Sequence, residues 1–107
     1  MHTEIIISTT ENIAGKEIRE TIGLVKGNTI RARHIGSDIV SGFKSIVGGE
    51  IKGYVQALTD AREEAETRMI EEAKILNADA IVSVRYSTSQ VMTGAAEILV
   101  YGTAVKF

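Results

Sequence analysis

Three consecutive hydroxyl residues, Ser8, Thr9 and Thr10, carry side chains that could act as nucleophiles. An activated hydroxyl needs a general base within hydrogen-bond reach, and that base needs a third group to orient it. The sequence contains no recognisable set of this kind. Hydroxyl side chains are also common where a strand ends, because they hydrogen-bond to nearby backbone. We therefore favour a structural role and keep Thr9 and Thr10 as candidate ligand contacts.

Histidine and carboxylate side chains could do chemistry as metal ligands. His34 lies four residues before Asp38, a spacing that can bring two ligands together, whereas His2 lies beside the first residue. A stable zinc site takes three or four ligands, and soft metals prefer thiolate, thioether and imidazole groups. The chain has no Cys, three Met and two His. We assign no metal ligand and no cofactor, although symmetric copies of the chain could supply further ligands.

Asp38, Tyr54 and Arg62 are the remaining candidate ligand contacts. Asp38 falls in the first turn of an expected helix, where a carboxylate also serves as a cap. Tyr54 could hydrogen-bond a ligand, and Arg62 could hold a carboxylate or phosphate. The alternative, which we favour, is packing for Tyr54 and an ion pair with Glu66 for Arg62.

Composition narrows the class of protein. The chain has 107 residues, of which 44% are hydrophobic and 24% charged, as expected for one globular domain spanning residues 1–107. Its net charge of -2 creates no field that would attract nucleic acid or an anionic membrane. Apolar runs such as Ile5–Ile7 are far shorter than the roughly 20 residues of a membrane helix, and no signal-peptide pattern opens the chain. We expect a cytoplasmic protein.

The first third of the chain favours strands. Ile5–Ile7 is a short β-branched strand, and a longer strand is expected from Lys16 to about Ala32. Gly27-Asn28 could form either a hairpin turn or a bulge inside one strand, and we favour the bulge. Shared parity predicts one mostly buried face made of Ile18, Ile22 and Leu24.

Two helices are expected in the middle. The first runs from Ile35 to Ile46, before a stop at Gly48-Gly49, and the second from Tyr54 to Leu76, with Asn77 as its C-cap. Ile70 lies about 120° from the centre of the second helix's apolar stripe, so we expect it to face a partner subunit. The stripe itself comprises Tyr54, Leu58, Ala61, Ala65, Met69, Ala73 and Leu76.

The C-terminal third predicts a β-hairpin. One strand runs from Ala80 to Gln90, with Val82, Val84 and Tyr86 on one side, and a second from Glu97 to Phe107, with a turn at Thr93-Gly94. Helices grouped between strands are typical of an α+β domain. We predict two layers, an antiparallel sheet with two helices on one face.

These features together resemble one family. The chain resembles the YbjQ-like family of small bacterial proteins in a set of short segments that occur in the same order. These segments are Ser8-Thr9-Thr10, Gly15, Asp38, Ile46-Val47-Gly48-Gly49, Tyr54, Ala61-Arg62, Ala78-Asp79-Ala80 and Gly102-Thr103-Ala104-Val105. The resemblance implies a dodecin-like subunit assembled into a pentameric ring, without an established activity. The heavy-metal-binding label that some members carry fits poorly here, because the chain offers few soft ligands.

We carry three hypotheses forward. The first is a homo-oligomeric module, pentameric as the resemblance implies, that binds a small ligand or a protein partner at subunit junctions. The second is an enzyme whose active site forms only between subunits, and the third is a weak metal-binding protein. No catalytic residue is assigned. Ile5, Ile6, Ile7 and Ile70 are candidate interface residues, and we expect the strand Ile5–Ile7 to join a neighbouring subunit's sheet.

Overall fold

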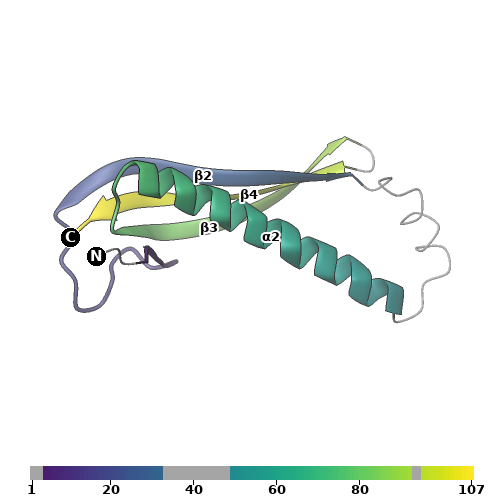
Figure 1. Cartoon of the computed structure of the whole chain (residues 1–107), viewed down its shortest axis with the longest axis horizontal. Helices are drawn as coiled ribbons and strands as arrows, with labels where there is room; N and C mark the ends of the chain where they lie inside the picture. The colour runs from purple at the N-terminus through teal and green to yellow at the C-terminus, as the bar shows by residue number, and fades with distance from the viewer. Residues whose placement is uncertain (1–3, 33–48, 93–94) are drawn as a thin grey trace.

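A computed structural model describes residues 4–32, 49–92 and 95–107. In it, one helix packs on one face of a four-stranded sheet whose strand order is β1-β3-β4-β2 (Figure 1). The elements are β1 (Ile6–Ile7), β2 (Glu20–Ala32), α2 (Gly49–Ile75), β3 (Ala80–Met92) and β4 (Ala95–Lys106). The predicted α+β class is confirmed.

Two details of the predicted architecture need correction. The sheet is mixed, because β1 pairs in parallel with β3, while the other pairs are antiparallel. A parallel neighbour is joined through a long stretch of chain rather than a tight turn, so no local signal records it. In the described residues one helix covers the sheet, where two were predicted. The expected helix from Ile35 to Ile46 and the turn at Thr93-Gly94 lie outside the described residues.

The apolar stripe of α2 was predicted correctly at its centre. Ala61, Ala65, Met69 and Ala73 are completely buried, and Leu58 packs against the same core. The helix begins at Gly49, five residues earlier than expected, and ends at Ile75. Small side chains in the stripe let the helix backbone approach the sheet closely.

Gly27 is the point of closest approach between β2 and α2. It is neither a turn nor a bulge, because β2 continues through it with Gly27 opposite Val100 and the next residue opposite Leu99. A Cβ atom at Gly27 would overlap the carbonyl oxygen of Ala65 and lie 2.5 Å from the backbone nitrogen of Met69. The glycine is therefore explained by helix packing, not by strand geometry.

The C-terminus of α2 closes as the sequence predicted. Asn77 adopts a left-handed conformation with φ of 61°. Its backbone N–H donates to the Lys74 carbonyl at 3.0 Å, and the Ala78 N–H donates to the Ala73 carbonyl at 3.0 Å. This pair of bonds is a Schellman motif, which satisfies carbonyl groups left without helical partners.

A bulge in β2 reverses the predicted faces of that strand. The pairing with β4 shifts register between Thr21 and Gly23, and Gly23 has φ of 150°. An extra residue in one strand moves every later side chain to the opposite face. Leu24, predicted to be buried, is 64% exposed, whereas its neighbour Val25 is completely buried under α2.

A second bulge does the same in β3. The register shifts between Val82 and Arg85, and Ser83 takes a left-handed conformation with φ of 55°. Val84 therefore joins the core beneath α2, whereas Val82 belongs to a separate cluster on the other face. The prediction that Val82 and Val84 share one side was wrong for this reason.

The face of the sheet away from α2 is called here the back face, and within residues 4–32, 49–92 and 95–107 it is covered at one end only. There a small core of Ala80, Val82 and Val105 is packed by partly buried side chains from the segment between β1 and β2 and from the C-terminus, namely Ile13, Ile18 and Phe107. Elsewhere the back face exposes large apolar side chains. No helix in the described ranges is both long and apolar enough to span a membrane.

Candidate functional site

Three polar side chains form a row across the open part of the back face. Tyr101 of β4 pairs directly with Lys26 of β2 on one side and with Arg85 of β3 on the other. Directly paired residues share a face of the sheet, and Lys26 lies on the opposite face from the buried Val25. All three side chains are exposed. This set, called here the cation row, places Tyr101 between a lysine and an arginine in neighbouring strands.

Apolar side chains lie on the same face, on both sides of the cation row. Leu24 is 64% exposed and Ile30 is 57% exposed, while Tyr101 itself is 37% exposed. Leu99, which pairs with Asn28 beside the row, is half-buried. An exposed apolar strip with a few charges is typical of a surface that another molecule covers.

The hydroxyl segment Ser8–Thr10 packs along the bulged part of β3. The Ser83 N–H donates to the Thr10 carbonyl at 2.9 Å, and the Val84 N–H donates to the Ser8 carbonyl at 2.9 Å. The Thr10 hydroxyl donates to the Asn12 carbonyl at 2.5 Å and lies 2.6 Å from the Ser8 hydroxyl. Within the described residues no histidine or carboxylate hydrogen-bonds these hydroxyls, so the structure supplies no base to activate them.

Arg85 connects this segment to the cation row. One guanidinium nitrogen, Nη1, donates to the carbonyl of Thr9 at 3.0 Å and to the carbonyl of Val84 at 2.9 Å. Its other nitrogens have no hydrogen-bond partner in the described part of the chain, and the residue is exposed beside Tyr101 in the sheet. Sequence reasoning missed Arg85, Lys26 and Tyr101, because their alignment depends on the register of three strands and on two bulges.

The candidates on α2 lie on the other side of the sheet. Arg62 is exposed, and its predicted ion pair with Glu66 is not formed. Glu66 instead accepts a hydrogen bond from the Tyr86 hydroxyl of β3 at 2.6 Å. Partial burial of Tyr86, followed by this hydrogen bond and the negative charge of Glu66, raises the pKa of Tyr86 to about 12.

The structure does not bring the predicted ligand contacts together as one site. Thr9 and Thr10 lie beside β3, and Arg62 lies on α2, with no hydrogen bond or ion pair between them among the described residues. Tyr54 belongs to α2, but its side chain is outside the described set, as is the whole of Asp38. His2 and His34 also lie outside it. The residues that the structure describes include no group of three potential metal ligands.

The candidate interface isoleucines largely serve their own subunit. Ile5, Ile7 and Ile70 are partly buried and pack against the main core, and Ile6 is 40% exposed. β1 pairs with β3 of the same chain, through Ile6 opposite Ala80 and Ile7 opposite Ile81. One edge of this strand therefore belongs to its own subunit's sheet, while the expectation that the strand also joins a neighbour's sheet stays a prediction.

The comparison with known families agrees with the sequence resemblance. The YbjQ family, described as "Putative heavy-metal-binding", matches residues 5–107. The chain belongs to this family. Relatives named UPF0145 protein cover nearly the whole chain. The one from Archaeoglobus fulgidus is 59% identical over 106 residues, which are 99% of this chain and 98% of the relative.

Further relatives come from both domains of prokaryotic life. The UPF0145 protein of Halorubrum lacusprofundi is 56% identical over 94% of this chain and 96% of its own length. That of Thermosipho melanesiensis is 58% identical over 95% of this chain and 94% of its own length. The family is thus archaeal as well as bacterial, which corrects the expectation of a bacterial family.

A solved structure shares the fold. A crystal structure of a protein of unknown function from the DUF74 family of Pediococcus pentosaceus matches with a TM-score of 0.64. The match covers 96% of this chain and 97% of that one, at 19% sequence identity. At this identity the likeness establishes the fold alone.

Proposed function

We propose that this chain is a cytoplasmic, non-enzymatic subunit of a closed homo-oligomeric ring, which binds a small ligand or a protein partner at the junctions between subunits. Five subunits is the number that the family resemblance implies. The proposal rests mainly on the open back face of the sheet. In a two-layer subunit α2 covers one face, so the other face needs a second cover wherever it is apolar.

The energetics favour covering this face. Full burial of a leucine or isoleucine side chain contributes about 1.5 to 3 kcal/mol. Leu24 and Ile30 are each more than half exposed, so covering both contributes roughly 2 to 4 kcal/mol to each junction. A ring repeats this contribution at every junction without adding a new kind of surface.

Native mass spectrometry of the purified, tag-free protein tests the proposal. We expect a species of five times the 11.6 kDa subunit mass, together with any small molecule that the junctions retain. A subunit-mass monomer at micromolar concentration would overturn the proposal. A dimer would overturn the ring.

A matched pair of variants tests the back face specifically. Leu24→Thr combined with Ile30→Thr places β-branched side chains, which favour strands, at both positions of β2 and removes apolar area. We expect the midpoint concentration for dissociation to be higher for this variant than for the unmodified protein. Its circular dichroism spectrum should be unchanged. Val55→Thr is the control, because Val55 is 53% exposed near the start of α2, away from the back face.

A further inference from the structure

The charges on the two broad sides of the subunit have opposite signs. On the back face, Lys26 and Arg85 lie on either side of Tyr101, and the Lys26 ammonium has no ion-pair partner among the described residues. Glu97 is an acid on this face, but its carboxylate accepts a hydrogen bond from the Asn28 side chain at 3.0 Å. The Asn28 amide is neutral and leaves the charge of Glu97 in place, so Lys26, Arg85 and Glu97 give the described part of the open back face two positive charges and one negative charge, a net positive charge.

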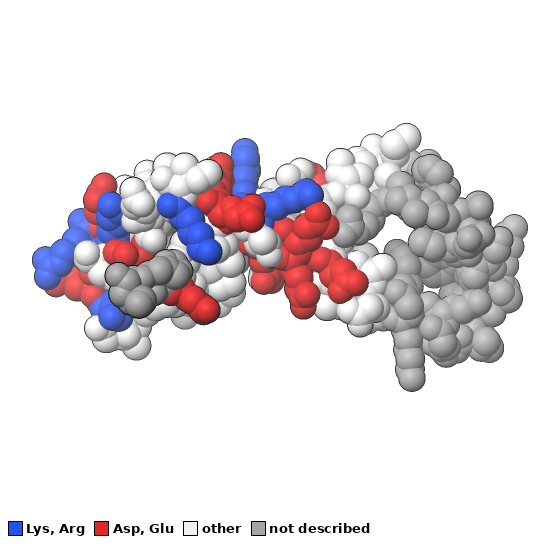
Figure 2. Space-filling view, viewed as in Figure 1, with Lys and Arg blue, Asp and Glu red and all other residues white. Residues whose placement is uncertain are grey.

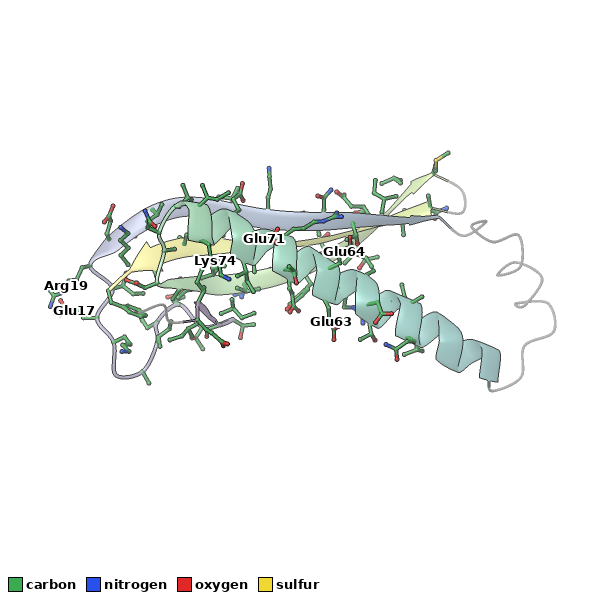
Figure 3. All side chains as sticks on the ribbon, viewed as in Figure 1. Glu17, Arg19, Glu63, Glu64, Glu71 and Lys74 are labelled. Atoms are coloured by element: carbon green, nitrogen blue, oxygen red, sulfur yellow. The ribbon has the colours of Figure 1, made fainter. Side chains whose placement is uncertain are left out.

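The outer side of α2 is acidic. Asp60, Glu63 and Glu71 lie on the helix surface away from the buried stripe and are exposed. Figure 2 shows acidic side chains gathered over the middle of α2, and Figure 3 shows Glu63 projecting away from the strands. Glu63 and Glu71 have no side-chain hydrogen bond or ion pair with any other described residue. We call the surface that carries Asp60, Glu63 and Glu71 the outer helix face. Lys74 adds one positive charge at its C-terminal end.

The exposed edge of β2 is blocked by side chains of α2. The Lys26 N–H donates to the Glu72 carboxylate at 2.8 Å, and the Asn28 carbonyl accepts from Arg68 Nη1 at 2.6 Å. Both backbone groups would otherwise be open to pairing with another strand. At the other edge, β1 is only two residues long. Copies of this subunit are therefore better suited to associate through their faces than through their sheet edges.

We propose that the cation row of one copy receives the acidic outer helix face of a second copy of this chain. The inference rests on the proposed self-association and specifies its orientation. Each copy offers a positive back face and a negative outer helix face, so every junction is head-to-tail, the kind of contact that closes into rings. Burial strengthens such charge pairs, and like-charge contacts disfavour the other orientations.

The dimensions of the two surfaces match. Lys26 and Arg85 are two strands apart, about 10 Å at the usual strand spacing. Glu63 and Glu71 are separated by about 12 Å along the helix axis at the usual rise per residue. Flexible lysine and arginine side chains span the difference. In this arrangement the partner's helix runs across the strands, and the Tyr101 hydroxyl lies where it can donate to a carboxylate.

Charge reversal and its rescue test the orientation. Lys26→Glu alone, and Glu63→Lys with Glu71→Lys, should each raise the midpoint concentration for dissociation about tenfold or more, because each turns attraction into repulsion. The triple variant, with all three changes in one chain, should return that midpoint to within about threefold of the unmodified value. Arg85 is left unchanged, because it also holds the Thr9 carbonyl.

Matched controls separate local contacts from net charge. Arg19→Glu matches the charge change of Lys26→Glu, and Glu4→Lys with Glu11→Lys matches that of the double reversal. All three positions are exposed and lie outside helices and strands, so these variants should leave the midpoint within about twofold. Circular dichroism checks that every variant remains folded. The readout is native mass spectrometry across a dilution series at low ionic strength.

Each outcome decides a different claim. If the unmodified protein is a monomer, the proposed self-association fails and this inference fails with it. If it assembles but the reversals change nothing, the charge contact is wrong while self-association stands. If Lys26→Glu dissociates the assembly and the triple variant does not restore it, the back face meets some surface other than the outer helix face, which also overturns the inference.

Discussion

Replacing Gly27 by alanine should separate α2 from the sheet, because this glycine has no room for a side chain. An added Cβ would overlap the Ala65 carbonyl oxygen, lie 2.5 Å from the Met69 nitrogen and lie 2.9 Å from the Arg68 Cβ. Two of these three atoms are helix backbone, which cannot rotate aside. Restoring ordinary contact distances requires α2 to retreat by about 1 Å.

The expected cost follows from that displacement. Overpacking a close contact costs typically about 1 to 3 kcal/mol, and the upper end applies where backbone must move. The retreat also strains the bonds that join α2 to β2, from Lys26 N–H to Glu72 and from Arg68 to the Asn28 carbonyl. Alanine is better than glycine within a strand by roughly 0.5 to 1 kcal/mol, which offsets part of the cost. We expect a net loss of about 2 kcal/mol.

Urea unfolding, monitored by the circular dichroism signal of the helix, measures this loss of unfolding free energy. With a urea dependence of about 1 to 3 kcal/mol per molar, the midpoint should fall by roughly 1 M. All samples need the same protein concentration, since self-association stabilises the folded state. Gly15→Ala is the control, because Gly15 has a φ of 80° but nothing within 4 Å of an added Cβ. A Gly27→Ala midpoint equal to or above that of Gly15→Ala would refute the packing argument.

Two further substitutions test the hydrogen bond of Tyr86 and the left-handed conformation of Asn77. Tyr86→Phe should destabilise the protein below pH 10, and the difference should vanish as pH rises past 12, because folded Tyr86 keeps its proton to about pH 12 while the unfolded residue loses it near 10. Urea unfolding between pH 9 and 12 checks this, and a difference independent of pH would contradict it. Asn77→Ala should cost about 1 kcal/mol, because alanine is strained in the left-handed conformation, whereas Asn77→Gly should be neutral or stabilising. Thermal unfolding of the pair should show Asn77→Ala melting first.

Elements in which apolar residues repeat at a regular spacing could be predicted from the sequence. The buried stripe of α2 repeats over several turns, and Asn77 marks its end, so the helix and its cap were both identifiable. The final hairpin was predicted because its two β-branched runs are separated by a glycine turn. In these segments local preference and tertiary structure agree.

The predictions of which strand residues are buried were wrong where one extra residue shifts the pairing register of a strand. The bulges at Gly23 and Ser83 reverse which side chains face α2, so Leu24 was placed in the core and Val82 was grouped with Val84. Glycine at position 23 was a usable signal, because isolated glycines in strands often mark bulges. Ser83 offered none, since serine rarely adopts a positive φ. The cation row was unpredictable for the same reason, because Arg85 reaches the back face only through the second bulge.

Metal binding is the property on which the family description and the side chains of this chain disagree most. The chain has no cysteine and two histidines, and the described residues bring no three potential ligands together. We expect zinc or copper to bind, if at all, with a dissociation constant above about a micromolar, because each missing ligand weakens a tetrahedral site. Calorimetry on the tag-free assembled protein measures this. Stoichiometric binding below a micromolar that disappears in His34→Ala but persists in His2→Ala would contradict the expectation and show that ring symmetry supplies the missing ligands.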